Sequence, residues 1–328
     1  RISGISALIK ESNEPMRWYI TFHGGGDAKD WNNIHSFDLS GKPTGKMLDE
    51  HTLPGHLELR ELRGFAFGPD GDLYIANAFK DDSQILRFHG ALDKNGRHVF
   101  RDVFSSRDSH NPGLDHPFAV TFGPDGHLYV PSQDTNVVSR YAGPGSTSGE
   151  PGAPLPIADD LMQSAAAHLP PGTFVASNKH TADGLQAVRG TVFAGNGNLL
   201  VADRDANTVK AYHGSTGAPV RAYTHANLKT PIHVLPQADN ALLVGSRDSN
   251  AIVRIDLETG AIDVLVETAQ GGLKGPAGMA IGPDGWLYVC SRESKQILRF
   301  DTGTGRPDSA PFITDLPDFP EFIVLVDN

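Results

Sequence analysis

The sequence contains a single cysteine, Cys290, among 328 residues. One cysteine excludes a disulfide within the chain and a cysteine-based zinc cluster. No apolar run approaches the roughly 20 residues of a membrane-spanning helix, so we expect a soluble protein with no membrane partner. Blocks of lysine and arginine are absent and the formal net charge is −11, which argues against nucleic acid as a partner. No signal-peptide pattern is visible, and the compartment stays open between cytoplasmic and periplasmic or secreted.

What the sequence does contain is a repeat. FAFGPDGDLYIAN begins at Phe65, VTFGPDGHLYVPS at Val120 and MAIGPDGWLYVCS at Met279, and degenerate copies begin at Thr191 and Val234. A polar turn and a second apolar segment, such as SQILRF or NAIVRI, follow each copy. Each unit therefore predicts a strand, a tight turn, a second strand, another turn and a third strand.

The GPDG segments have the chemistry of hairpin turns. Proline presets φ, aspartate bonds locally and glycine accepts a positive φ, so Asp70, Asp125 and Asp284 are predicted to be structural. The copies lie about 43 to 55 residues apart, apart from one interval of about 71. That longer interval predicts an insertion at 143–186, a loop plus a short helix over the upper face. A period of this size with several short strands predicts propeller blades.

The two ends of the chain complete the pattern. RWYITF and NNIHSFDLSG supply the second and third strands of a further blade, and the C-terminal PEFIVLV matches a first strand. Pairing of these terminal strands would close the ring and leave no exposed edge. ISGISALI at positions 2–9 competes for the same place or adds an outer strand. We predict an all-β chain, residues 1–328 forming one six-bladed β-propeller, with seven blades as the alternative.

The GPDG-x-LY hairpins and the segment ADRDANTVKAY resemble NHL-type six-bladed propellers. They are also similar to the streptogramin lyase and senescence-marker/gluconolactonase relatives, and the resemblance covers nearly the whole chain. It implies that the inner strands run from the upper face to the lower one and that ligands sit at the upper mouth of the central channel. It does not fix an activity, because one propeller fold carries many functions.

Ionisable residues that do not repeat occur where the inner strands begin. They are Arg63, His116, Arg189, His233 and Glu321. A buried ionisable group near the axis is costly unless it is paired or hydrated. Two interpretations stay open: the arginines pair with carboxylates and plug the channel, or the set forms a pocket for an anionic or carbonyl-bearing ligand.

Three more arginines follow the second strands, in DRDAN, SRDSN and SRESK. These are Arg204, Arg247 and Arg292. Equivalent positions in the repeat place them on the upper face, where they would create a local positive field. Because each arginine precedes a carboxylate in the sequence, surface ion pairs between blades are the competing interpretation.

The segment TFHGGGDAKDW, residues 21–31, resembles the oxyanion-hole segment of lipases and esterases. No G-x-S-x-G nucleophile motif follows it, so an α/β-hydrolase is not indicated. The segment is predicted to be a glycine-rich loop on the upper face, either a long hairpin only or one whose His23 and backbone amides contact a ligand.

Metal binding stays open. His116, His233 and Glu321 have the donor types for a divalent calcium, magnesium or zinc ion. The resemblance implies a Glu, Asn and Asp set in gluconolactonase-like relatives, and Glu321 falls near the first of these, but no matching Asn-Asp-Gly segment occurs. Streptogramin lyases hold magnesium with His and Glu, yet the second strands here end differently, in LYIAN, LYVPS and LYVCS.

We therefore expect an enzyme, lyase- or hydrolase-like, that acts on a small polar or anionic molecule at the upper mouth. His233, His116 and Glu321 would be catalytic, with a histidine as general acid or base. The substrate would be bound by Arg63, Arg189, His23, Arg204, Arg247 and Arg292. The alternative is a non-enzymatic propeller scaffold that binds a ligand or a protein. The sequence leaves the oligomeric state open.

Overall fold

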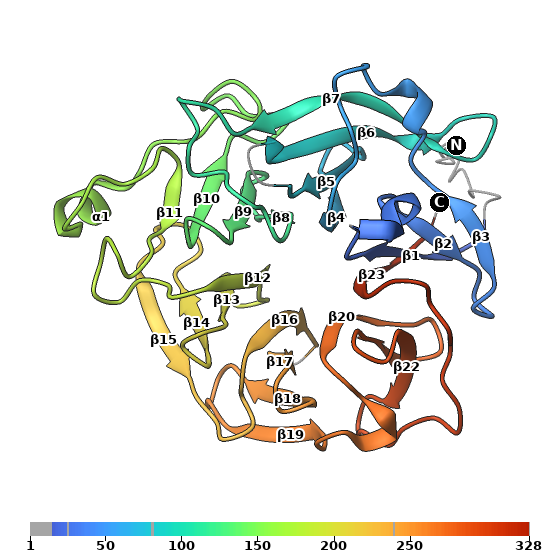
Figure 1. Cartoon of the computed structure of the whole chain (residues 1–328). Coiled ribbons are helices and arrows are strands. Elements are labelled where there is room, and N and C mark those ends of the chain that lie inside the picture. Colours follow the sequence, from blue (N-terminus) through green and yellow to red (C-terminus); the bar gives the residue numbers. More distant parts are fainter. Residues whose placement is uncertain (1–14, 25, 80–81, 239, 328) are drawn as a thin grey trace, which may run out of the picture.

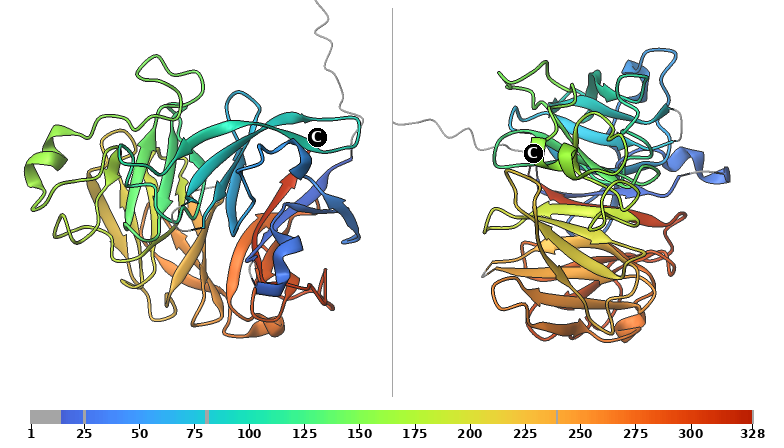
Figure 2. Two further views of the ribbon diagram at one scale, coloured as in Figure 1. Left: turned by 45° about the horizontal axis from the view of Figure 1, so that its top comes forward. Right: turned by 90° about the vertical axis from the view of Figure 1, so that its left-hand side faces the viewer.

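The computed structural model describes residues 15–24, 26–79, 82–238 and 240–327. Six antiparallel sheets stand around a central axis, as Figure 1 shows from the direction of that axis. The two further views in Figure 2 show the sheets side by side in one ring. The prediction of a six-bladed β-propeller is confirmed, and the seven-bladed alternative is not. The segment at positions 2–9 lies outside the described residues.

Five blades have four strands and one has three. From the axis outward, the first blade consists of β23 (Pro320–Val326), β1 (Arg17–Phe22), β2 (His35–Phe37) and β3 (Pro43–Lys46), and the second of β4 (Leu62–Phe67), β5 (Leu73–Asn77), β6 (Gln84–Leu92) and β7 (His98–Ser106). The third consists of β8 (Thr121–Phe122), β9 (Leu128–Ser132), β10 (Val137–Tyr141) and β11 (Thr173–Val175), and the fourth of β12 (Val188–Phe193), β13 (Leu199–Asp203), β14 (Thr208–Tyr212) and β15 (Pro219–Tyr223). The fifth consists of β16 (Pro231–Pro236), β17 (Ala241–Ser246), β18 (Ala251–Asp256) and β19 (Ile262–Val266), and the last of β20 (Pro276–Ile281), β21 (Trp286–Ser291) and β22 (Gln296–Asp301).

The ring closes as the sequence predicts. Strand β23 pairs antiparallel with β1, and Tyr19 lies opposite Val324 in the register. The C-terminal segment thus supplies the inner strand of the blade whose other strands come from the N-terminal part of the chain. Because strands from the two ends of the chain share this one sheet, β1 is not left as an unpaired edge strand.

The GPDG turns close the hairpins between first and second strands. Asp70 accepts a hydrogen bond from the hydroxyl of Tyr74 at 2.9 Å, and Asp125 accepts one from Tyr129 at 2.8 Å. Gly71 follows at φ +80°, in the left-handed region that glycine adopts without strain. These contacts explain the repeat as a turn that also satisfies a buried tyrosine.

Apolar side chains between neighbouring blades form the core. One cluster joins Trp18 of the first blade to Tyr288 of the last, with ring centroids 4.3 Å apart. Another joins Tyr74 and Val130 of adjacent blades. Packing of this kind fixes each blade against the next and so fixes the side chains that surround the axis.

The segment 143–186 differs from the predicted insertion. Its residues Thr173–Val175 form β11, the outer strand of a blade, so part of the segment belongs to the repeat. The short predicted helix is present as α1 (Asp159–Ser164). It lies at the outer perimeter beside β11 rather than over the channel mouth (Figure 1). The described residues include three short 3-10 helices, η1 (Gly26–Trp31), η2 (Glu50–Thr52) and η4 (Gln270–Gly272). In the described part of the chain no helix is long and apolar enough to cross a membrane.

Candidate functional site

A cavity of about 180 Å³ lies on the axis, on the face where the inner strands begin. We call this the axial cavity and this side of the ring the upper face. All of the predicted site residues except His233 line it, together with Phe118, Gln133, Ile232, Pro276 and Ala277. The structure therefore brings together side chains from all parts of the sequence, which is what the ring of inner strands predicts.

Two sets of equivalent positions build the walls. The upper axial ring is the second residue of each inner strand, or its counterpart: Arg63, Phe118, Arg189, Ile232, Ala277 and Glu321. In each blade the preceding residue pairs with the last residue of the second strand, and the register shifts directly afterwards in most blades, as between Leu62 and Phe65. Such irregularities re-aim side chains, here toward the channel.

The outer rim is the residue that follows each second strand. It consists of His23, Ala78, Gln133, Arg204, Arg247 and Arg292, and all but Ala78 line the axial cavity. Gln133 is the member that our sequence analysis missed. The aligned segment SQDTN, beside DRDAN and SRDSN, was the signal that could have found it.

His233 lies one position deeper than we expected. It aligns with Gly64 and Gly190 rather than with Arg63, because Pro231 is the residue opposite Ser246. A side chain at Gly190 would meet the backbone of Ile232 at 2.7 Å, so this level of the channel is crowded. The ring of His233 packs instead against Phe118 and Phe322, at centroid distances of 5.2 and 4.5 Å. These aromatic side chains close the floor of the cavity.

Glu321 is the one carboxylate in the cavity wall, and it is 5% exposed. It accepts a hydrogen bond from Nε of Arg292 at 2.9 Å and lies 3.2 Å from Nδ1 of His23. Burial raises the pKa of Glu321, but the hydrogen bond with His23 and the charges of Arg63 and Arg292 outweigh it and hold the pKa well below its usual range. Glu321 is therefore ionised at neutral pH.

Arg63 links the glycine loop to the same centre. Its guanidinium donates to the backbone oxygen of His23 at 2.9 Å and lies 3.4 Å from Glu61. The arginine pairing that we held as an alternative is thus present here. It joins Arg63 to Glu61, which directly precedes β4, and Arg292 to Glu321 of the next blade.

The glycine loop is held by its own backbone. The amide of His23 donates to the oxygen of Phe319 at 2.8 Å, and that of Gly24 donates to Asp318 at 2.7 Å. Gly24 has φ +62°, and a Cβ atom there would lie 1.9 Å from Oδ1 of Asn32. These two amides are therefore engaged in structure, which favours the long hairpin over an oxyanion-binding loop among the two interpretations that we left open. Gly25 lies outside the described residues.

Arg189 differs from the other arginines of the cavity. Its guanidinium donates to the backbone oxygen of Val188 at 2.7 Å and lies over the ring of Phe118. None of the described residues offers it a carboxylate within the 4.0 Å of an ion pair. Burial, reinforced by the charge of Arg204, lowers the pKa of Arg189 to about 10. The side chain is still cationic at neutral pH, but only distant carboxylates compensate it.

Arg204 and Arg247 also line the axial cavity. Arg204 pairs with the adjacent Asp205 at 2.6 Å, whereas Arg247 lies 3.6 Å from Glu293 of the next blade. The Nε atom of Arg247 is buried without a hydrogen-bond partner among the described residues. The surface ion pairs that we weighed for these arginines are present, but that of Arg247 runs from this same Nε atom and is too long for a hydrogen bond.

The two predicted catalytic imidazoles are neutral at pH 7. Burial lowers the pKa of His233 to about 4. Burial also lowers the pKa of His116; Asp134 opposes this and Arg63 adds to it. The Nε2 atoms of both rings are buried and have no hydrogen-bond partner in the described part of the molecule.

No group of three or more His, Cys, Asp or Glu side chains among the described residues is arranged to hold a metal ion. The set of His116, His233 and Glu321 does not form such a group. Glu321 is instead bonded to His23 and Arg292. The residues of this site therefore do not fit the divalent metal that we considered.

Comparison with known proteins places the chain by its fold. No protein-family model matches it, and neither does any curated protein sequence. Solved structures do match. A periplasmic gluconolactonase from Pseudomonas aeruginosa is 15% identical over 95% of this chain and 99% of its own, with a TM-score of 0.57. A nidogen/laminin complex is 15% identical over 94% and 98%, with a TM-score of 0.63. A streptogramin B lyase is 17% identical over 78% and 70%, with a TM-score of 0.50. At this identity the likeness shows the fold, and at that level the resemblance read from the GPDG hairpins is confirmed.

Proposed function

We propose that this protein is an enzyme that binds an anionic group of a small molecule in the axial cavity and moves a proton there. One observation carries the proposal: five guanidinium groups and a single carboxylate line the cavity. Guanidinium groups are well suited to carboxylate and phosphate oxygens, because their planar donors match those oxygens in pairs. Although the protein carries a net negative charge, arginines that lie together at one place create a locally positive electrostatic potential there.

Arg189 and Arg247 are the groups that we assign to the anion. Arg189 is half-buried with no carboxylate in ion-pair contact among the described residues, and Nε of Arg247 makes no hydrogen bond there and lies 3.6 Å from Glu293. A buried charge or donor of this kind is destabilising until a partner reaches it. A ligand anion would supply the missing acceptors for both side chains and would take the place of water in the cavity.

His23 is the side chain that we assign to proton transfer. Its Nδ1 atom faces the ionised Glu321 at 3.2 Å, and its side chain is 43% exposed at the cavity. Arg63 and Arg292 also lie 3.3 and 3.4 Å from this Nδ1 atom, so the proposal requires the tautomer in which Nδ1 donates to Glu321 and Nε2 keeps the lone pair for a substrate. A histidine oriented by a carboxylate is the usual form of a general base. His233 and His116, by contrast, are held neutral by burial.

The anion test is calorimetric titration with acetate and inorganic phosphate at pH 7. We expect Arg189→Met to weaken binding by about 10- to 100-fold, since charge-assisted hydrogen bonds contribute about 1.5 to 3 kcal/mol. Arg254→Met is the matched control, because Arg254 lies on an outer strand and pairs with Asp263 at 2.8 Å. Equal affinity in the wild type and Arg189→Met would contradict the assignment.

The proton-transfer test uses a panel of anionic lactones, esters and elimination substrates, chosen because solved structures of this fold include a gluconolactonase and a lyase. For any substrate that is turned over, His23→Gln should abolish turnover and leave phosphate affinity within about threefold. If anions bind but no member of the panel reacts, the non-enzymatic binding protein is the better description. Turnover that survives His23→Gln would contradict the role of His23.

A further inference from the structure

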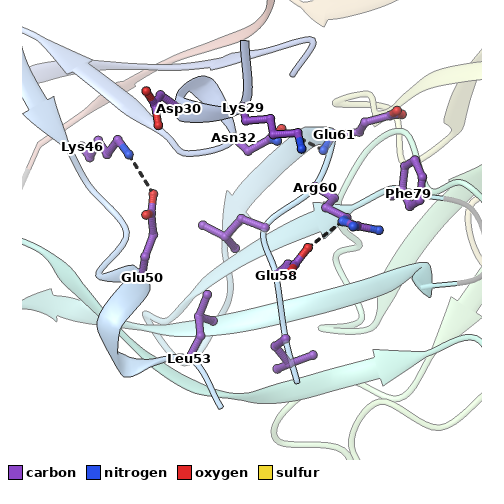
Figure 3. Close-up of a pocket in the computed structure, with 12 residues that line it drawn as sticks. Lys29, Asp30, Asn32, Lys46, Glu50, Leu53, Glu58, Arg60, Glu61 and Phe79 are labelled. Atoms are coloured by element: carbon purple, nitrogen blue, oxygen red, sulfur yellow. Dashed lines mark hydrogen bonds and ion pairs between the residues drawn. The ribbon is translucent and has the colours of Figure 1, made fainter. Parts of the chain in front are cut away.

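A second, larger cavity lies beside the axial one. It has a volume of about 600 Å³. We call it the outer pocket. Its wall comes from four places: the turn after β1, the end of β3 with the η2 segment, the chain that leads into β4, and Phe79 after β5. Figure 3 shows Lys46, Glu50 and Leu53 on one side of it and Arg60 and Phe79 on the other.

Glu61 connects the two cavities. It lines the outer pocket, and its carboxylate lies 3.4 Å from Arg63 and 3.8 Å from His116, both of which line the axial cavity. Its backbone amide donates to Oδ1 of Asn32 at 3.0 Å, and its φ is +48°. Asn32 also borders the outer pocket and packs against Gly24 of the glycine loop. Asn32 and Glu61 therefore lie at the boundary between the two spaces, and Figure 3 shows both at the edge of the outer pocket.

The lining of the outer pocket is of a different kind from that of the axial cavity. Its charges largely neutralise one another: Lys46 pairs with Glu50 at 3.1 Å and Arg60 with Glu58 at 2.9 Å. Three leucines, Leu53, Leu57 and Leu59, and the ring of Phe79 supply apolar surface. Such a lining favours an uncharged group that combines apolar surface with a few hydrogen-bonding atoms.

The volumes point to one ligand in both cavities. Pockets that bury a small organic molecule usually enclose about 300 to 1,000 Å³. The axial cavity, at about 180 Å³, is below that range, whereas the outer pocket, at about 600 Å³, lies within it. The arginine-lined space therefore suits an anionic group alone, and the rest of a larger molecule needs the neighbouring space.

We infer that the ligand is an elongated anion whose charged group occupies the axial cavity and whose bulky, uncharged, partly apolar body occupies the outer pocket. This inference rests on the proposed function, because it requires an anion in the axial cavity. It adds the substrate class: a carboxylate or phosphate that carries an aromatic or similarly amphiphilic body. Glu61 and Asn32, which lie between the two cavities, would contact the middle of the ligand.

The experiment compares acetate, which has only the charged group, with ω-(4-bromophenyl)alkanoates of two to six methylene groups. Dissociation constants are measured by calorimetry, and bromine is located by anomalous diffraction from soaked crystals. We expect one chain length to bind at least about tenfold more tightly than acetate, because the aryl body leaves water. Bromine should then lie against Leu57 and Phe79.

Leu57→Ser supplies the matched variant, with Leu39→Ser as its control, since Leu39 is an exposed leucine outside both cavities. Leu57→Ser should remove the gain of the aryl series and leave acetate affinity unchanged, whereas Leu39→Ser should change neither. The inference fails if acetate binds but no aryl compound binds more tightly, if the gain survives Leu57→Ser, or if bromine lies elsewhere. If neither acetate nor any aryl compound binds, the proposed function fails and this inference fails with it.

Discussion

The two faces of the ring use charged residues in opposite ways. On the lower face, the aspartates of the GPDG turns repeat from blade to blade, and each binds a tyrosine of its own blade, as Asp284 does with Tyr288 at 2.9 Å. On the upper face, equivalent positions vary: the upper axial ring has arginine in two blades and Phe, Ile, Ala or Glu in the others, and some contacts cross between blades, as from Arg292 to Glu321. Repeated residues build the blades, and departures from the repeat collect at the axis, where a site can form.

The largest expected effect is on the upper face. Replacing Glu321 with Gln should lower the free energy of unfolding at pH 7 by about 3 to 5 kcal/mol, because it removes the buried carboxylate that pairs with Arg292 and compensates the charge of Arg63. Urea denaturation measures the change. Glu58→Gln is the control, since Glu58 is an exposed partner of Arg60, and it should change stability by less than about 0.5 kcal/mol.

The difference in stability between the wild type and Glu321→Gln should depend on pH. The pKa of Glu321 is lower in the folded state than its ordinary 4.5, so the stabilisation from its ionised form is complete above that pH and is lost as the pH falls toward the folded-state pKa. The advantage of the wild type over Glu321→Gln should shrink below about pH 4.5. An advantage that grows on acidification would reverse our account of this carboxylate.

A substitution of His233 tests whether the floor of the axial cavity takes part in anion binding. Because burial lowers its pKa from 6.5 to about 4, its contribution to stability is present above pH 6.5 and is lost as the pH falls through about 4. His233→Phe should reduce the loss of stability between pH 7 and 4 by on the order of 1 to 3 kcal/mol. It should also leave acetate affinity unchanged, and a large loss of affinity would place His233 in the site after all.

On the lower face the expected pattern is the reverse. Asp125→Ala removes the acceptor of the Tyr129 hydroxyl and should lower the free energy of unfolding by about 1 kcal/mol. Acetate and phosphate should bind as they do to the wild type. A change in anion affinity would show that the two faces are coupled, which our comparison does not allow.

The smallest expected effect is a difference in phosphate affinity between variants of two arginines of the axial cavity. Arg204 already has Asp205 at 2.6 Å, whereas Arg189 has no carboxylate in contact among the described residues. Arg204→Met should therefore weaken phosphate binding by only about threefold, less than Arg189→Met. Equal losses in the two variants would mean that pairing with Asp205 does not reduce the contribution of Arg204.

Much of this could be predicted from the sequence because the repeat carries it. The GPDG turns, the closure by PEFIVLV and the collection of Arg63, Arg189 and Glu321 at one mouth all follow from aligning equivalent positions. A repeat of this length predicts a ring of blades, and in such a ring the aligned positions of all blades lie around the same end of the central channel.

What escaped prediction depends on details that the repeat does not carry. His233 was placed one residue too high because the degenerate copy around it obscures the register. Asp318 accepts the hydrogen bond of the Gly24 amide, but it lies in a segment outside the repeat, so no sequence pattern predicted this contact. The outer pocket is made by connections between strands, whose course is set by tertiary packing and not by local periodicity.

The most direct test of the account is anomalous diffraction from wild-type crystals soaked in selenate, a tetrahedral dianion. We predict a selenium peak in the axial cavity, with selenate oxygens within hydrogen-bond distance of the Arg189 and Arg247 guanidinium groups. Selenate elsewhere on the protein with none in the axial cavity would contradict the claim that the arginines of the upper face form an anion site.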